Sequence, residues 1–181
     1  MQRALNTAQQ LTPNCWKASL LYRTVHERTW LMTNSLKWLV LASLANLVGN
    51  GFGTMLALQH NLTGDFGGWL NGQNILRDFL TFKGTALSAP LPFMLIQLGL
   101  TILALRPGTS GRIGVGGVTF VGALYTIAQL GEPIVLRVWS PSGFDPAQAV
   151  VLFVNVASAI AMLVLGIRAW RTMRASVPLT G

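Results

Sequence analysis

The sequence predicts an all-α integral membrane protein, a bundle of four transmembrane helices with an amphipathic cytoplasmic helix at its N-terminus. Hydrophobic residues make up 51% of the chain and charged residues only 10%, whereas charged residues make up about 25% of a typical soluble domain. Four nearly uncharged runs reach the length of about 18 residues or more that a helix needs to cross a bilayer. The runs are continuously apolar and lack the alternation of transmembrane barrel strands, so a β-barrel is excluded.

Composition also excludes several function classes. The single cysteine cannot form an internal disulfide framework. The net charge is +8, but the basic residues are scattered between apolar runs, which argues against nucleic-acid binding. His26 and His60 both lie outside the runs, so neither suits a haem, and no helical pair of ligands indicates a metal. We therefore expect no metal and no cofactor other than bound lipid.

Residues 1–35 form the first predicted segment, an amphipathic arm on the cytoplasmic side. Thr12 and Pro13 have the pattern of a helix N-cap followed by the first helical residue. A loose apolar stripe then runs beside three basic residues, which favours a helix lying on an anionic lipid surface. The alternative is that the arm docks onto a neighbouring subunit. The apolar stripe consists of Trp16, Leu20, Leu21, Val25 and Met32.

The bundle itself is predicted for residues 36–171, followed by a cytoplasmic tail over 172–181. At 1.5 Å rise per residue, each run is long enough for a hydrocarbon core of roughly 30 Å. The first span is free of charge and the second ends at Arg106. The four predicted spans are about 38–58, 87–105, 113–139 and 147–167.

The orientation follows from the basic residues next to the spans. Ten of the thirteen lysines and arginines fall on the side that holds both termini, so both termini are predicted to be cytoplasmic. Trp38, Trp139 and Trp170 lie at span ends, where tryptophan favours the interface. Ten arginines against three lysines suggest a GC-rich bacterial genome, and hence the bacterial inner membrane.

The long outer loop, residues 59–86, combines turn-forming residues with a short helix. Residues 61–68 are rich in asparagine, aspartate and glycine, which favour turns. The following helix is expected to lie flat on the outer surface. Its apolar face consists of Ile75, Leu76, Phe79 and Leu80.

The first span also carries a ridge of small residues. Ala45, Gly49, Gly53 and Ala57 recur every four residues, and Gly49 with Gly53 has the GxxxG spacing. Lipid tails give helices no hydrophobic reason to associate, so close approach at small residues must supply the packing energy. We predict that this ridge packs against another span or against another chain.

All four spans place polar side chains in one layer at or slightly outside the midplane. By the helical rise, Asn50 lies about 18 Å from the inner end of its span, and Asn155 about 12 Å below the outer end of its own. Such a layer can line a cavity that opens outward. The candidate ligand-binding residues are Asn50, Gln97, Tyr125, Gln129, Glu132 and Asn155.

Glu132 is the only carboxylate inside a predicted span. Pro133 cannot donate a hydrogen bond to the Gln129 carbonyl, so a kink and a free carbonyl are expected there. Tyr125, Gln129 and Glu132 share one helix face by their spacing. One interpretation is a ligand or proton site, because intramembrane carboxylates face cavities or the bundle interior. The other places Glu132 at the outer interface, paired with one of three basic residues: Arg77, Lys83 or Arg137.

Three functions remain open. The first is a non-catalytic accessory or assembly subunit of a larger membrane complex, which associates with other membrane subunits or with itself in the lipid bilayer. The second is a small-solute or lipophilic-ligand transporter or binding protein with an outward-facing cavity around Glu132. The third is a membrane-embedded enzyme that uses Glu132 and His60 as acid and base. We favour the first because the chain is small, carries the small-residue ridge and basic amphipathic ends, and lacks a catalytic constellation.

Overall fold

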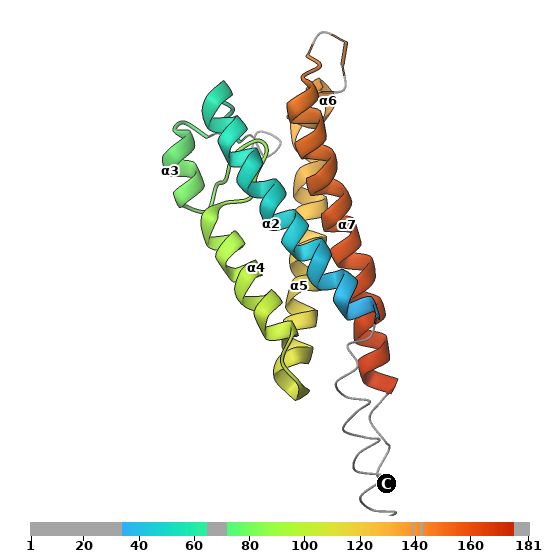
Figure 1. The fold of residues 1–181 in the computed structure, drawn as a ribbon. Helices are drawn as coiled ribbons and strands as arrows, with labels where there is room; N and C mark the ends of the chain where they lie inside the picture. The colour runs from blue at the N-terminus through green and yellow to red at the C-terminus, as the bar shows by residue number, and fades with distance from the viewer. Residues whose placement is uncertain (1–33, 65–71, 139, 142, 176–181) are drawn as a thin grey trace, which may run out of the picture. The chain divides into compact units, whose positions relative to one another are not determined.

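The computed structural model describes residues 34–64, 72–138, 140–141 and 143–175. Every regular element within these ranges is an α-helix (Figure 1). The amphipathic arm predicted for residues 1–35 and the end of the predicted tail lie outside the described residues, apart from a few positions. The elements are α2 (Asn34–His60), α3 (Ile75–Leu80), α4 (Leu91–Ala104), α5 (Gly108–Leu130), α6 (Pro133–Val138) and α7 (Pro146–Ala175).

Three of these helices, α2, α5 and α7, are long and apolar enough to cross a membrane. This agrees with the prediction of a helical membrane protein. The fourth apolar helix, α4, has 14 residues and is therefore about 21 Å long. That length is less than the roughly 30 Å of a hydrocarbon core, so the described helices do not amount to four full-length spans.

The second predicted span begins as a helix later than expected, at Leu91 rather than residue 87. Pro90 and Pro92 explain the difference. Proline has no N–H, so these two residues cannot donate the bonds that a helix starting at residue 87 would need, but both are tolerated in a first turn. Residues 84–90 are consequently non-helical, although Gly84 to Ser88 are buried.

The third predicted span is also interrupted. The helix α5 ends at Leu130, and α6 restarts at Pro133, so the expected kink is a complete break. The Gln129 carbonyl, expected to be free, accepts a hydrogen bond of 3.3 Å from the Glu132 N–H. The break therefore places Glu132 in the short connection between two helices.

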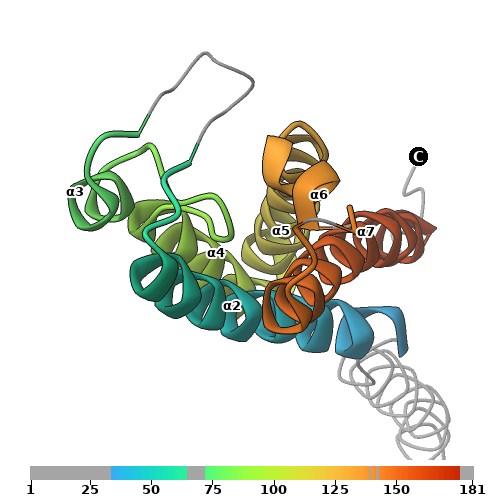
Figure 2. The same ribbon diagram turned by 90° about the horizontal axis from the view of Figure 1, so that it is seen from above.

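Helix α7 packs against α2 and α5, and α4 packs against α5 and α2 (Figures 1 and 2). A connection of three residues, 105–107, joins α4 to α5. From this connection the two helices diverge toward the end of the structure that carries α3 and α6 (Figure 1). We call this end of the structure the α6 end.

Two helix ends near the α6 end have clear local causes. Helix α2 stops because Asn61 adopts a left-handed φ of 54°, and the Leu62 N–H then donates to the Ala57 carbonyl at 2.9 Å, which is the pairing of a Schellman cap. Helix α7 begins because the Asp145 carboxylate accepts hydrogen bonds from the N–H groups of Ala147 and Gln148. Both ends agree with helix-capping preferences.

The small residues of α2 make contacts within the chain. A Cβ at Gly49 would collide with the Asn155 side chain of α7, and one at Gly53 would collide with the Leu87 carbonyl. Ala57 is fully buried, whereas Ala45 is exposed. Three of the four residues of the predicted ridge thus face other parts of the described chain.

We expect Gly49→Leu to destabilise the protein, because the new side chain would push α2 away from α7. Overpacking of a close contact costs about 1–3 kcal/mol. Gly51→Leu is the matched control, since a Cβ there meets nothing within 4 Å. Unfolding of the full chain in detergent measures the effect, and equal stabilities of the two variants would contradict the contact.

Candidate ligand-binding pocket

Buried polar side chains connect α2 to α4. The Gln97 amide of α4 donates hydrogen bonds to the Ser43 carbonyl at 3.0 Å and to its hydroxyl at 3.1 Å. The hydroxyls of Ser43 and Thr101 are hydrogen-bonded at 2.7 Å. All three side chains are buried. Gln97 therefore holds two helices together.

A second set of hydrogen bonds connects α2 to α7. The Asn46 amide donates to the Asn155 carbonyl at 3.2 Å and to the Ser158 hydroxyl at 2.9 Å. The Asn50 amide donates to the Asn46 side-chain oxygen at 3.0 Å. These side chains are buried. Their hydrogen bonds offset the free energy that it costs to remove polar atoms from water.

The same asparagines hold the non-helical segment before α4. The Ala89 N–H donates to Oδ1 of Asn50 at 2.6 Å, and the Asn155 amide donates to the Leu87 carbonyl at 3.0 Å. Hydroxyls add a further link, because Thr54 and Ser88 are hydrogen-bonded at 2.8 Å. Since buried backbone groups need partners, these side chains replace the hydrogen bonds that a helix would have supplied.

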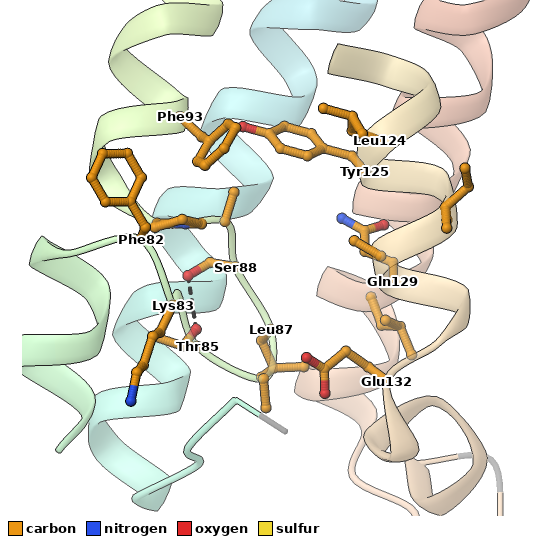
Figure 3. Close-up of a pocket in the computed structure, with 16 residues that line it drawn as sticks. Phe82, Lys83, Thr85, Leu87, Ser88, Phe93, Leu124, Tyr125, Gln129 and Glu132 are labelled. Carbon is orange, nitrogen blue, oxygen red and sulfur yellow. Dashed lines mark hydrogen bonds between the residues drawn. The ribbon is translucent and has the colours of Figure 1, made fainter. Parts of the chain in front are cut away.

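A pocket of about 310 Å³ lies between α4 and α5 near the α6 end (Figure 3). This volume is at the lower end of the roughly 300–1,000 Å³ that is usual for small-molecule sites. Leu152 of α7 contributes to its lining. One wall is α5 and the connection that follows it, with Leu124, Tyr125, Ile127, Ala128, Gln129 and Glu132. The other wall consists of Phe82, Lys83, residues 85–90 and Phe93.

Tyr125 is the most informative side chain of the pocket. Only 6% of its surface is exposed, and its hydroxyl is buried without a hydrogen-bond partner among the described residues. The hydroxyl points across the pocket toward Phe93 (Figure 3). Most buried polar atoms of proteins have a partner, so this hydroxyl is suited to a bound molecule.

Gln129 and Glu132 follow Tyr125 along the same wall. The Oε1 atom of Gln129 is also buried without a hydrogen-bond partner in the described part of the chain. Glu132 is 6% exposed. It lines the pocket at the opposite end from Tyr125 and Phe93 (Figure 3). The wall thus presents a hydroxyl, an amide and a carboxylate in one row.

The structure separates the six predicted site residues into two groups. Tyr125, Gln129 and Glu132 line the pocket. The other three form the hydrogen bonds described above, between α2 and α4 or to the non-helical segment before α4, and they do not contribute to the pocket lining that the structure describes. These three are Asn50, Gln97 and Asn155.

Most of the second wall of the pocket was not predicted from the sequence. Phe82 and Phe93 lie on either side of the non-helical segment, with ring centroids 6.1 Å apart and their planes perpendicular. No spacing in the sequence relates them to α5, because these residues lie opposite α5 only in the folded structure. The turn at Gly84 was the one available signal, and its φ of 75° requires glycine.

Of the three basic residues predicted as partners of Glu132, one lines the pocket with it and two do not. Lys83 shares the pocket, whereas Arg77 and Arg137 do not line it. His60, the suggested catalytic partner, is exposed at the end of α2 and does not line the pocket either. Among the described residues, no group of three or more histidine, cysteine, aspartate or glutamate side chains is placed to hold a metal.

No known protein family, curated protein or solved structure matches the chain. The interpretation of the pocket therefore depends on its own geometry.

We expect Asn50→Leu to loosen the segment before α4, because the Ala89 N–H would lose its acceptor inside the protein. A buried unsatisfied group costs about 1–3 kcal/mol. Hydrogen exchange of the full chain should show faster exchange in residues 84–90. Gln59→Leu is the control, since Gln59 is exposed on the same helix; unchanged exchange in the Asn50 variant would contradict the assigned bond.

Proposed function

We propose that this protein binds a lipophilic molecule within the membrane, in the pocket between α4 and α5. The observation that carries the proposal is the Tyr125 hydroxyl, which is buried, aimed into the pocket, and unpartnered among the described residues. An apolar pocket with a few convergent polar groups is the usual form of a small-molecule site. The proposed ligand places its apolar body on the aromatic side chains and a polar group near Tyr125 and Gln129.

The exposure of the pocket residues indicates how a ligand enters. Ile127 and Phe82 both line the pocket, yet they are 72% and 70% exposed. In a membrane, apolar side chains exposed to this extent on a helical protein are in contact with lipid tails. We infer that the pocket opens to the lipid-facing surface, so that a ligand enters from the bilayer rather than from water.

We also propose four membrane crossings, with both termini in the cytoplasm of a bacterium. In this topology, α4 and the buried non-helical segment 84–90 together form the second crossing. Non-helical backbone is tolerated at membrane depth where the protein buries it. The charges support the direction, because the described acidic residues lie toward the α6 end and Arg106, Arg112, Arg168, Arg171 and Arg174 lie toward the other.

Single cysteines test this topology. In a Cys15→Ser background, which removes the only native cysteine, we expect Gln73→Cys to react with a membrane-impermeant maleimide on intact bacteria. Thr109→Cys should react only after permeabilisation, because α4 would separate the two positions. Both residues are exposed in the structure. Reaction of both cysteines on intact cells would show that α4 does not cross.

The accessory-subunit hypothesis stays a prediction. Its main sequence support was the small-residue ridge, and Gly49 and Gly53 of that ridge are used in contacts within the chain. The pocket is thus the more specific observation. Association with other membrane subunits remains compatible with a ligand in the pocket, since the pocket occupies only the α4–α5 side at the α6 end.

A photoreactive probe tests ligand binding directly. We expect dodecanol carrying a diazirine to label the peptides that contain Tyr125 and Phe93 when the full chain is held in dodecyl maltoside micelles. Ala128→Trp fills the pocket and should abolish this labelling. Ala157→Trp is the matched control, because Ala157 is exposed on α7 and does not line the pocket.

Two results would contradict the proposal. One is labelling spread evenly over the exposed apolar helix faces. The other is labelling of the pocket peptides that Ala128→Trp and Ala157→Trp reduce equally.

A further inference from the structure

Tyr125 gives the pocket a hydrogen-bond donor that lacks an acceptor. Its hydroxyl is buried and unpartnered among the described residues, on a side chain that is only 6% exposed. An O–H group that is buried without an acceptor loses its hydrogen bond to water and gains none in return. A ligand seated beside Tyr125 is therefore expected to offer a lone pair on oxygen or nitrogen.

Gln129 gives the pocket the complementary group, one turn further along α5. Its Oε1 atom is buried and has no hydrogen-bond donor in the described part of the chain. The residue lines the same wall of the pocket as Tyr125. A carbonyl oxygen accepts only from an N–H or O–H group. The wall thus calls for one acceptor and one donor, on neighbouring turns of the helix.

The Tyr125 hydroxyl and the Gln129 amide are uncharged, and the charged residues of the pocket lie away from Tyr125. Lys83 is exposed and its ammonium group points away from the tyrosine, while Glu132 lies at the opposite end (Figure 3). A charged head beside Tyr125 would lose its water without meeting a counter-charge, which costs free energy. The polar head of the ligand is therefore expected to be uncharged.

Aromatic rings at the Tyr125 end provide contact area for the rest of the ligand. Phe93 faces the Tyr125 hydroxyl (Figure 3), and Phe82 packs edge to face against Phe93 with ring centroids 6.1 Å apart. Aromatic side chains offer large apolar surfaces. Since the pocket has only about 310 Å³, we expect it to hold the head and the first part of a long chain, with the remainder in lipid.

We propose that the ligand of this pocket is a long-chain carboxamide, whose carbonyl oxygen accepts from the Tyr125 hydroxyl and whose N–H donates to Oε1 of Gln129. This inference rests on the proposed function. An amide carries its acceptor and its donor on two atoms of one planar, uncharged group, and the wall carries the complementary atoms on two turns of α5. The amide has two possible sources, a free fatty amide or the head of an N-acyl lipid, and the chemistry that the pocket recognises is the same in both.

Competition between amides that differ only at nitrogen tests the inference. The full chain is labelled with diazirine dodecanol in dodecyl maltoside micelles, and N-methyldodecanamide or N,N-dimethyldodecanamide is added as competitor. The first amide keeps an N–H group, whereas the second has none. We expect N-methyldodecanamide to suppress labelling of the Tyr125 peptide at about tenfold lower concentration, since one hydrogen bond to a buried group is worth roughly that factor.

Gln129→Leu should remove this advantage, because it removes the acceptor of the amide N–H. Gln59→Leu is the matched control, since Gln59 is exposed on α2 and does not line the pocket. Tyr125→Phe should weaken competition by both amides relative to tridecane, which has no polar group. Both pocket substitutions remove a buried atom that has no partner among the described residues, so thermal unfolding in the same micelles should show that both variants are folded.

The outcomes distinguish this inference from the proposed function. Equal competition by the two amides in the unmodified chain, or an advantage that Gln129→Leu leaves unchanged, would overturn the amide assignment and leave the pocket standing. Dodecanol that competes as strongly as N-methyldodecanamide would do the same. Failure of the probe to label the pocket peptides at all would overturn both. Stronger competition by dodecanamide than by N-methyldodecanamide would identify a free fatty amide as the source, and the reverse order would identify an N-acyl lipid.

Discussion

The hydrogen bonds to residues 85–89 determine how the other parts of this structure fit together. This segment is non-helical and almost fully buried, so its peptide groups require partners from elsewhere in the chain. Asn50 of α2 and Asn155 of α7 supply them. Because Asn46 also bonds α2 to α7, one set of amide side chains fixes the segment, the crossing of the two helices and the position at which α4 begins.

Close contacts at glycine make these short bonds possible. Gly49 lies against Asn155, and Gly53 lies against the Leu87 carbonyl, the same two groups that hydrogen-bond to each other. Any side chain at either glycine would move α2 away from the groups that its asparagines bind. Packing and hydrogen bonding on α2 are therefore a single constraint, as is common where helices associate in lipid.

The sequence was informative wherever a local rule applied. Tyr125, Gln129 and Glu132, which helical spacing groups, all line one wall of the pocket, and Pro133 indicated the irregularity in the helix at the end of that row. Hydropathy misjudged the start of α4, because it scores apolar residues and ignores the N–H groups that Pro90 and Pro92 lack.

The placement of the remaining polar residues depended on contacts distant in the sequence. The helical rise predicts a similar depth for Asn50, Gln97, Asn155 and the residues that line the pocket, but side chains at one depth can face different neighbours. Gln97 binds the carbonyl of Ser43, which is 54 positions away in the sequence. Asn155 binds the carbonyl of Leu87, which is 68 positions away. Periodicity along one helix carries no information about such pairs, and the same limit hid the wall formed by Phe82 and Phe93.

The two walls of the pocket differ in structure, and one of them also belongs to the hydrogen-bonded framework of the fold. The first wall is helical as far as Leu130, whereas Leu87 and Ser88 of the opposite wall belong to the segment that α2 and α7 hold. A molecule resting on that wall touches the hydrogen-bonded centre of the fold. Occupancy and folding are then thermodynamically linked, so that each tenfold rise in free ligand above its Kd adds about 1.4 kcal/mol to the stability of the whole chain. Detergents that strip such a molecule would weaken the helix assembly itself, far beyond the vacated pocket.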